Sequence, residues 1–414
     1  MRRETTRQGA AGRPGGATRR QFLLGGAAAG VGAAAAIGID RVVARAQNDE
    51  QPQPKPERHG ASAVSFYGEH QAGIATDAQA HATLLGFDLL PDVDRGALRR
   101  MMRLLSDDAA RLTAGEPALA DTEPELAGEP ARLTVTFGFG RTFVERTQTV
   151  PPEWLAPLPS FGIDELRDEF SGGDLLIQVA ADDPLTVSHT VRMLSKDARS
   201  FATLRWSQQG FRRAYGTTAP GTTMRNLFGQ VDGTTNPRPS DDHFDRIVWN
   251  REGWLAGGSG VVIRRIRMNL DTWDRADRQA REFSVGRTLD SGAPLTGENE
   301  HDEPDFDAKG PLGFPMIDDI AHIRRARTSD PTEKIFRRVY NYDVPSSDPA
   351  AVSDSGLLFI SFQADVARQF TPLQRRLAEG DLLNIWTTPI GSAVFAIPPG
   401  CGKGGYIGET LLET

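Results

Sequence analysis

The sequence predicts an α+β fold of two domains with the same plan, each an antiparallel sheet with helices on one face. The main observation is a repeat, in which an apolar strand, an aspartate and an amphipathic helix follow one another at 175–194 and again at 357–377. The 414 residues are enough for two domains or for one very large one. Coincidence is the alternative explanation of the repeat, because this succession of elements occurs in many folds.

The first predicted domain spans 63–225 and contains three strands and two helices that can be read from apolar spacing. Residues 82–90 (ATLLGFDLL) end before a proline and suit a buried strand, whereas 133–140 (LTVTFGFG) alternate as a half-buried strand does. The strand 175–181 is followed by Asp182 and the helix of the repeat. Another helix is predicted from apolar residues at three- and four-residue spacing: Leu98, Met101, Met102, Leu105, Ala109 and Leu112.

The second predicted domain spans 226–414. Strands are expected at 260–270, 357–363 and 392–398, and the second of them leads through Asp365 into the repeated helix. The stretch 288–309 is rich in Gly, Pro and Asp and is predicted to be a long surface excursion. Loops of that length often cover functional sites.

The first 46 residues are predicted to be an export signal of the twin-arginine (Tat) type. Arg19 and Arg20 precede a mildly apolar run at 22–39, and residues 44–46 (ARA) form a possible cleavage site. The run could instead anchor the chain in a membrane, but it contains few Leu and Ile. Because the Tat route exports folded proteins, often with their cofactor in place, a periplasmic or extracellular protein is expected. Residues 47–62 are polar and Pro-rich and are predicted to form a disordered lead-in.

Composition and charge exclude several classes of function. The single cysteine, Cys401, excludes an intramolecular disulfide framework, an iron–sulfur cluster, a Cys-rich zinc site and a covalently attached c-type haem. The net charge is −8, and the predicted signal holds eight Arg and two acidic residues, so the rest of the chain carries about −14. No nucleic acid is expected as a partner of so acidic a protein.

Three side chains in distinctive short contexts are candidates for a metal-centred redox site, and Asp381 is considered beside them. Asp232 lies in GQVDGTTNP, His322 in AHIR and Arg337 in IFRR, and Asp381 follows a glycine. Taken singly, each has an ordinary structural interpretation. An aspartate of this kind usually caps a turn or a helix start, a histidine is satisfied in the core, and an arginine is solvated or ion-paired.

Taken together, these segments resemble the dye-decolourising peroxidases in order and approximate spacing. The resemblance covers about residues 64–410 and is closest to the exported branch that accompanies bacterial ferrous-iron uptake systems. It implies two ferredoxin-like domains with a haem pocket mainly in the second. Further matching segments are FYGEHQAGI (66–74), RWSQQGF (205–211), WLAGGSGVVIRRIRM (254–268), GAPL (292–295) and PIG (389–391).

The resemblance also implies non-covalent haem b and assigns residues to its proximal side. His322 would be the ligand of the iron, and Asp381 would accept the other ring N–H of the imidazole and orient it. Arg324 would face a haem propionate. The family often has Asn-Pro-Arg where this chain has residues 327–329 (RTS), so any propionate contact from that loop is in doubt.

On the distal side, the resemblance assigns Asp232 and Arg337. Asp232 would act on hydrogen peroxide first as a general base and then as an acid, and Arg337 would supply a fixed positive charge. Matching the preceding Ile-Phe pair to the family selects Arg337 rather than Arg338. The backbone of residues 233–235 (Gly233, Thr234 and Thr235) would approach the porphyrin closely.

The function implied is peroxide-dependent oxidation of dyes, phenolics or similar one-electron donors through an oxoferryl haem, with an acidic optimum. An alternative is a haem-handling protein or deferrochelatase of an iron-uptake system, with components of that system as partners. A haem-free interaction module is a third possibility. The expected partners are hydrogen peroxide and a small reductant, and a homodimer is compatible with the family. Tyr340, Tyr342 and Trp386 are candidate electron relays, although most such residues belong to the core.

Overall fold

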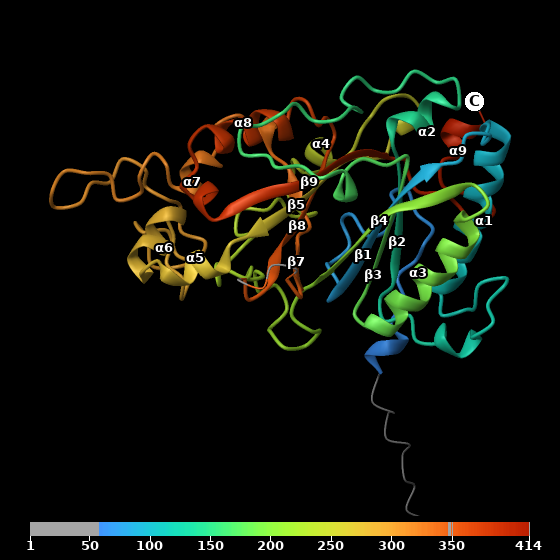
Figure 1. Ribbon diagram of the computed structural model, residues 1–414, viewed down its shortest axis with the longest axis horizontal. Coiled ribbons are helices and arrows are strands. Elements are labelled where there is room, and N and C mark those ends of the chain that lie inside the picture. The colour runs from blue at the N-terminus through green and yellow to red at the C-terminus, as the bar shows by residue number, and fades with distance from the viewer. Residues whose placement is uncertain (1–57, 347–348, 350, 414) are drawn as a thin grey trace, which may run out of the picture. The chain divides into compact units, whose positions relative to one another are not determined.

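The computed structural model describes residues 58–346, 349 and 351–413 (Figure 1). The predicted export signal and residues 47–57 of the lead-in lie outside the described residues. Within the described part, no helix is long and apolar enough to span a membrane.

The first half of the fold is a four-stranded antiparallel sheet with two long helices. Its strands pair in the order β4-β1-β3-β2. Asp94 and Asp183 cap the two helices by accepting hydrogen bonds from the backbone N–H of Ala97 and Thr186. The elements are β1 (His81–Leu89), α1 (Arg95–Thr113), β2 (Thr134–Phe139), α2 (Arg141–Glu145), β3 (Leu175–Ala181), α3 (Pro184–Ala198) and β4 (Ala202–Phe211).

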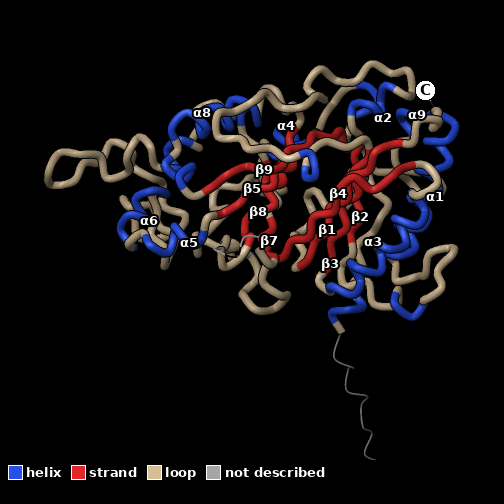
Figure 2. The backbone as a smooth tube through the Cα atoms, viewed as in Figure 1, coloured by secondary structure: helices blue, strands red, loops and turns tan. Residues whose placement is uncertain are grey.

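The second half repeats this strand order as β9-β5-β8-β7, with β6 also paired to β8 (Figure 2). Both halves therefore have the ferredoxin-like arrangement, and the predicted α+β fold class is confirmed. The helices are α4 (Phe244–Val248), α5 (Leu270–Arg275), α6 (Arg278–Val285), α7 (His322–Arg325), α8 (Phe370–Gly380) and α9 (Glu409–Leu412). The strands are β5 (Ser259–Met268), β6 (Phe336–Arg337), β7 (Tyr340–Val344), β8 (Asp354–Gln363) and β9 (Thr387–Ile397).

The two sheets meet at both edges and enclose a shared core. Phe139 of β2 pairs with Ala396 of β9, and Phe211 of β4 pairs with Asn341 of β7. Side chains from both sheets fill the space between them, including Leu84, Leu176, Trp206, Phe336, Leu358, Ile360, Tyr340, Tyr342 and Phe395. Each sheet thus has one face buried against the other sheet and one outer face that helices cover.

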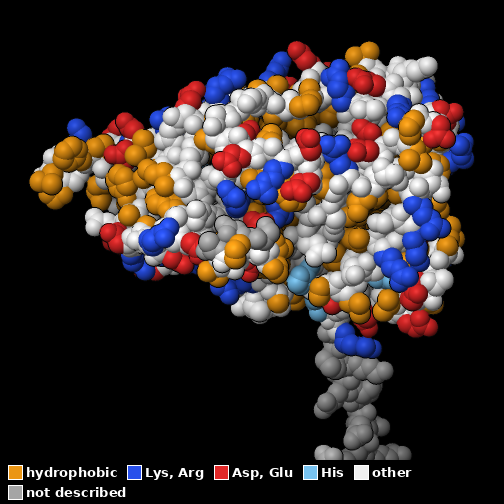
Figure 3. Space-filling view, in the orientation of Figure 1, with side chains coloured by type: hydrophobic (Ala, Val, Ile, Leu, Met, Phe, Trp, Pro, Cys, Tyr) orange, Lys and Arg blue, Asp and Glu red, His pale blue; other side chains and the backbone are white. Residues whose placement is uncertain are grey.

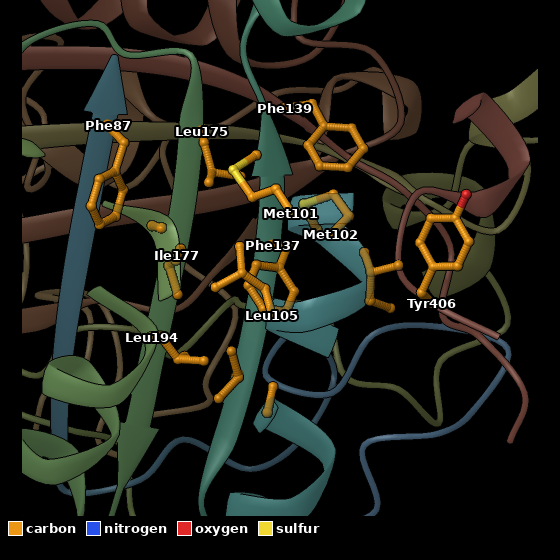
Figure 4. Close-up of a cluster of buried hydrophobic side chains, with 14 of the residues drawn as sticks. Phe87, Met101, Met102, Leu105, Phe137, Phe139, Leu175, Ile177, Leu194 and Tyr406 are labelled. Atoms are coloured by element: carbon orange, nitrogen blue, oxygen red, sulfur yellow. The ribbon is translucent and has the colours of Figure 1, made fainter. Parts of the chain in front are cut away.

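The helices of the two halves cover these outer faces differently. In the first half, α3 contacts β1, β3 and β4, and α1 contacts α3 and β2. Met101, Leu105, Phe137 and Leu194 belong to the resulting core (Figure 4). In the second half, α8 packs mainly against α7 and the 3-10 turn η5 (Pro331–Glu333), and Phe370 is its one buried residue. Phe370 packs with Val262 of β5 and Phe359 of β8, whereas Leu373 and Leu377 further along the helix stay half-buried, so α8 closes onto its sheet only in part.

Two expectations about irregular segments can be compared with the structure. Residues 58–62 are ordered, contrary to the predicted disordered lead-in. His59–Ala61 form a 3-10 turn, and the ring of His59 stacks on that of Tyr215 with the ring centroids 3.5 Å apart. Composition alone could not reveal that distant contact. The predicted excursion extends further than 288–309, since no helix or strand occurs between α6 and α7. It projects from the second half, and hydrophobic side chains lie at its tip in the space-filling view (Figure 3). Two of its residues, Leu312 and Phe314, are 86% and 72% exposed.

Candidate functional site

The short strand β6 brings Arg337 to Asp232. Arg337 Nη1 donates to Asp232 Oδ1 at 2.8 Å. Alternation along the strand turns Phe336 into the core between the sheets and leaves Arg337 on the outer face of the second sheet. The guanidinium of Arg338 points elsewhere, toward backbone carbonyls of residues 74–77 and the side chain of Gln79.

Two asparagines of the same loop hold this pair in place, and the sequence interpretation missed both. The side-chain amide of Asn236 donates to the carbonyl of Arg337 at 2.9 Å and accepts from its N–H at 2.7 Å. Asn226 Nδ2 donates to Asp232 Oδ2 at 3.3 Å. Asn236 belongs to the motif around Asp232, so its position in that motif was the available signal.

The turn after Asp232 is fixed by a glycine and by a glutamate from the excursion. Gly233 has φ +130°, a conformation that other residues rarely adopt. Thr234 Oγ1 and Thr223 Oγ1 donate to Glu300 Oε1 at 3.0 and 2.6 Å. Thr235 is exposed and lines a neighbouring cavity of about 650 Å³. The excursion thus contributes Glu300 to the site, although no short-range pattern distinguishes that residue.

His322 begins α7 and faces Asp381, which follows α8. His322 Nδ1 lies 2.5 Å from Asp381 Oδ2, while Asp381 Oδ1 accepts from the N–H of Leu383 at 3.0 Å. One carboxylate is therefore both a turn cap and the partner of the imidazole. Burial lowers the pKa of His322, but the charge of Asp381 and the hydrogen bond to it raise that pKa by more. Arg337 lowers it and Asp232 raises it further, so the second ion pair lies within electrostatic reach of His322.

Arg324 makes its contacts in the excursion. Arg324 Nη1 donates to the carbonyls of Phe306 and Ile317 at 2.6 and 3.1 Å, and Nη2 lies 2.8 Å from Asp319. Arg327, where the sequence departs from the family pattern, forms an ion pair with Glu303. These contacts attach the excursion to the helix that carries His322, and the propionate contact of Arg324 stays a prediction.

Incompletely buried apolar side chains belong to two clusters that also contain sequence neighbours of His322, Asp381 and Arg337. Phe359 of β8 packs against two separate apolar clusters and is half-buried, although its neighbours on the strand are buried. Leu373 and Leu377 of α8 are also half-buried, as are Ile266 and Trp386. Ser361, which pairs in register with Arg337, has a buried hydroxyl without a hydrogen-bond partner in the described part of the chain. This surface suits a flat apolar group with a few polar contacts.

The donor set at this surface fits haem. His322 Nε2 has no partner among the described residues, and Asp381 fixes the hydrogen on Nδ1, so Nε2 is available as a metal ligand. No group of three or more His, Cys, Asp or Glu that could hold a metal occurs in residues 58–346, 349 and 351–413. A metal held by His322 would thus need its remaining ligands from a non-protein group, as a porphyrin supplies them.

The aromatic residues considered as relays have different surroundings. Tyr340 and Tyr342 are fully buried in the core between the sheets. Trp386 is half-buried and meets Trp273 edge to face, with ring centroids 5.1 Å apart. Trp386 is therefore the candidate that lies at the apolar surface near Phe359.

Comparisons with known proteins agree with this geometry. The family model described as "Dyp-type peroxidase, N-terminal" matches residues 71–212, and "Dyp-type peroxidase, C-terminal" matches 223–402. A dye-decolorizing peroxidase of Thermobifida fusca is 37% identical over 96% of this chain and 98% of its own length. A deferrochelatase of Yersinia pestis is 36% identical over 84% of each chain. The structure of a DyP-type peroxidase from Cellulomonas bogoriensis has a TM-score of 0.83 and 51% identity, covering 86% of this chain and all of that one.

Proposed function

The chain belongs to the Dyp-type peroxidase family, and we propose that it uses hydrogen peroxide to oxidise dyes, phenolics or similar donors at haem b bound through His322. The family and its structural neighbours make the chain a haem peroxidase. One observation carries the finer proposal. Two ion pairs, Asp232 with Arg337 and His322 with Asp381, lie at the borders of one half-buried apolar surface.

The proximal residues would hold the cofactor. When bound, haem supplies an iron centre that accepts two oxidising equivalents from peroxide and passes them to donors one at a time. Asp381 orients the imidazole of His322 and makes it a stronger electron donor. The half-buried side chains of Phe359, Leu373 and Ile266 would cover the faces of the ring and exclude water.

The distal residues would handle the protons of peroxide. Asp232 can take a proton from one peroxide oxygen and return it to the other, which leaves as water. Arg337 stays protonated and stabilises the negative charge that develops on the departing oxygen. Asn236 donates one hydrogen bond to the backbone of Arg337 and accepts another from it, and this pair keeps the guanidinium beside Asp232.

An absorption spectrum and a turnover assay test this proposal. The protein loaded with haem is expected to show a Soret band and to oxidise an anthraquinone dye with peroxide. Arg337→Leu should keep the Soret band and lose most turnover, whereas His322→Ala should change the band itself. Asp245→Asn, an exposed change in α4, is the control. Dye oxidation that is unchanged in both site variants would rule out the assigned site.

Iron removal from haem is a second candidate, which the similarity to deferrochelatases over 84% of the chain favours. It predicts that haem-loaded protein releases iron without peroxide and leaves metal-free porphyrin behind. Porphyrin fluorescence would measure the first product, and a ferrous chelator added with a reductant would measure the second. Release that matches a haem-only control would exclude this activity.

We also propose export by the Tat route, which the twin arginines and the residues 44–46 support. Fusion of residues 1–62 to a reporter tests it. Replacement of Arg19 and Arg20 by Lys should keep the reporter in the cytoplasm. Export that survives this change would exclude the Tat route.

A further inference from the structure

A large cavity beside Asp232 is rich in arginine. Its volume is about 1050 Å³, and Asp232, Gly233, Thr234 and Arg337 form part of its wall. Seven arginines and three aspartates line it, whereas the whole chain has a net charge of −8. The cavity is therefore a local concentration of positive charge in an acidic protein, next to the proposed distal site.

Four of these arginines already form ion pairs or hydrogen bonds with other residues of the chain. Arg337 pairs with Asp232, and Arg132 pairs with Asp182 at 2.7 Å. Arg225 and Arg338 donate to backbone carbonyls around the cavity. The other three are Arg212, Arg213 and Arg238, and none of them forms an ion pair within the described part of the chain.

Arg212 has the most defined position of the three. It follows the last residue of β4, its Nε donates to the carbonyl of Val339 at 2.7 Å, and its Cζ lies 5.2 Å from the ring centroid of Tyr340. These contacts fix the plane of the guanidinium. They use one of its five N–H groups, and both Nη atoms have no hydrogen-bond partner among the described residues.

The electrostatic surroundings of Arg212 place it close to the distal pair. Burial lowers the pKa of Arg212, Tyr340 and Asp232 raise it, and Arg338 lowers it. Arg212 is half-buried, so its guanidinium has lost part of its hydration without gaining a carboxylate of its own. The ordinary alternative is that water accepts the hydrogen bonds of the Arg212 Nη groups, as it would for the exposed Arg213. A fixed and partly dehydrated guanidinium gains more binding free energy from an external anion than a mobile, hydrated one does.

We propose that this cavity binds the electron donor as an organic anion and that Arg212 determines this specificity. Arg212 would hold a carboxylate or sulfonate through its two Nη atoms, and Arg213 and Arg238 would attract the anion electrostatically. A cavity of this volume accommodates a small aromatic acid. The inference rests on the proposed peroxidase function, since it names the class of donor that this site oxidises.

The test uses two donors with the same phenol ring and different charge, ferulate and its neutral methyl ester. Equilibrium dialysis of the haem-loaded protein without peroxide measures binding separately from turnover. The wild type should bind ferulate about tenfold more tightly than the ester. Arg212→Gln should remove most of this preference, and Arg212→Lys should restore part of it. Arg192→Gln, on α3 and outside the cavity lining, is the matched control.

Steady-state kinetics with peroxide then shows whether Arg212 acts on donor binding or on the oxidation step. Arg212→Gln should raise KM for ferulate about fivefold or more, with kcat for ferulate and both constants for the ester nearly unchanged. Selective ferulate binding without oxidation of either donor would support the anion site and contradict the peroxidase proposal. Equal losses for both donors, or unchanged ferulate binding in Arg212→Gln, would overturn the anion site.

A second variant keeps the test decisive if Arg212→Gln does not fold. Arg213 and Arg238 are exposed, so their double replacement by Gln should leave the fold intact. It should weaken ferulate binding about threefold and reduce its salt sensitivity, with the ester unaffected. Ferulate binding that is insensitive to salt in both the wild type and the double variant would overturn the proposal.

Discussion

The first half of the molecule closes two helices onto its sheet, whereas in the second half, with the same strand order, only Phe370 at the start of α8 is buried against its sheet. In the first half, the apolar residues of α1 are buried against β2 and α3. In the second half, Leu373 and Leu377 of α8 stay half-buried, and the same half holds the two ion pairs of the site, His322 with Asp381 and Asp232 with Arg337. The same strand order thus supports both a packed scaffold and a site, and the two halves differ in how much of the helix is buried.

The largest expected effect separates function from stability in the second half. Asp232→Asn should lower kcat/KM for peroxide about a hundredfold or more, because a neutral amide cannot accept the proton. The free energy of unfolding should change by less than about 1 kcal/mol, because the amide has the same shape and keeps an oxygen that can accept the hydrogen bond from Arg337. Stopped-flow kinetics and urea unfolding measure the two quantities. A loss of stability that matches the loss of activity would mean that the ion pair mainly supports the fold.

The next prediction compares the two helices directly. Leu105→Ala on α1 should destabilise the protein by about 3 kcal/mol, because a fully buried side chain leaves a cavity. Leu373→Ala on α8 should cost about 1 kcal/mol or less in haem-free protein, because the side chain is half-buried there. Urea unfolding before and after haem addition checks both. Equal costs in haem-free protein would show that α8 is packed as tightly as α1.

Three strands in each half, the two long helices of the first half and α8 could be predicted from apolar spacing, but the difference between the halves could not. The strand at 175–181 and the helix around Leu98–Leu112 follow from local periodicity, and the structure confirms them as β3 and α1. The repeated helix was also predicted, yet its apolar residues do not reveal that only Phe370 among them is buried. The distance between a helix and a sheet depends on long-range packing that no single segment encodes.

For the site, the four central residues came from the resemblance of their motifs rather than from their spacing. Their supporting contacts were not predictable, because Glu300 and Asn226 carry no periodic signal and meet their partners only through the fold. Arg212 was missed for the same reason. It lies beside a segment matched to the family, yet only the structure shows its free Nη atoms at the cavity.

A third prediction tests the two roles of Asp381. Asp381→Asn keeps a side chain that caps the turn at Leu383, so the fold should be preserved. It removes the charge that raises the pKa of His322 and orients the imidazole, so haem affinity or turnover should fall about tenfold to a hundredfold. Haem titration by absorbance measures this. Asp183→Asn, at the cap of α3, is the control and should have no effect on haem.

The smallest expected effect concerns a pair of carboxyl groups in the first half, Asp108 and Asp197. Burial and the neighbouring carboxyl of Asp108 raise the pKa of Asp197, between α1 and α3, to about 7. In the unfolded chain an aspartate titrates near pH ~4, so between about pH 4 and 7 the folded protein holds a proton that the unfolded chain has lost. The free energy of unfolding should therefore fall as pH rises through this window and level off above it.

Asp197→Asn should remove this contribution, because the amide is neutral at every pH and can donate to Asp108. The variant should be more stable above pH ~7 by about 1 kcal/mol, a value reduced for the partial exposure of Asp197. Urea unfolding of the wild type and the variant at several pH values compares how steeply the free energy of unfolding of each depends on pH. Asp107→Asn, an exposed change on α1, should keep the slope of the wild type. If the free energies of unfolding of the wild type and Asp197→Asn depend on pH in the same way, Asp197 stays ionised in the folded protein. The first half would then tolerate two carboxylates in contact.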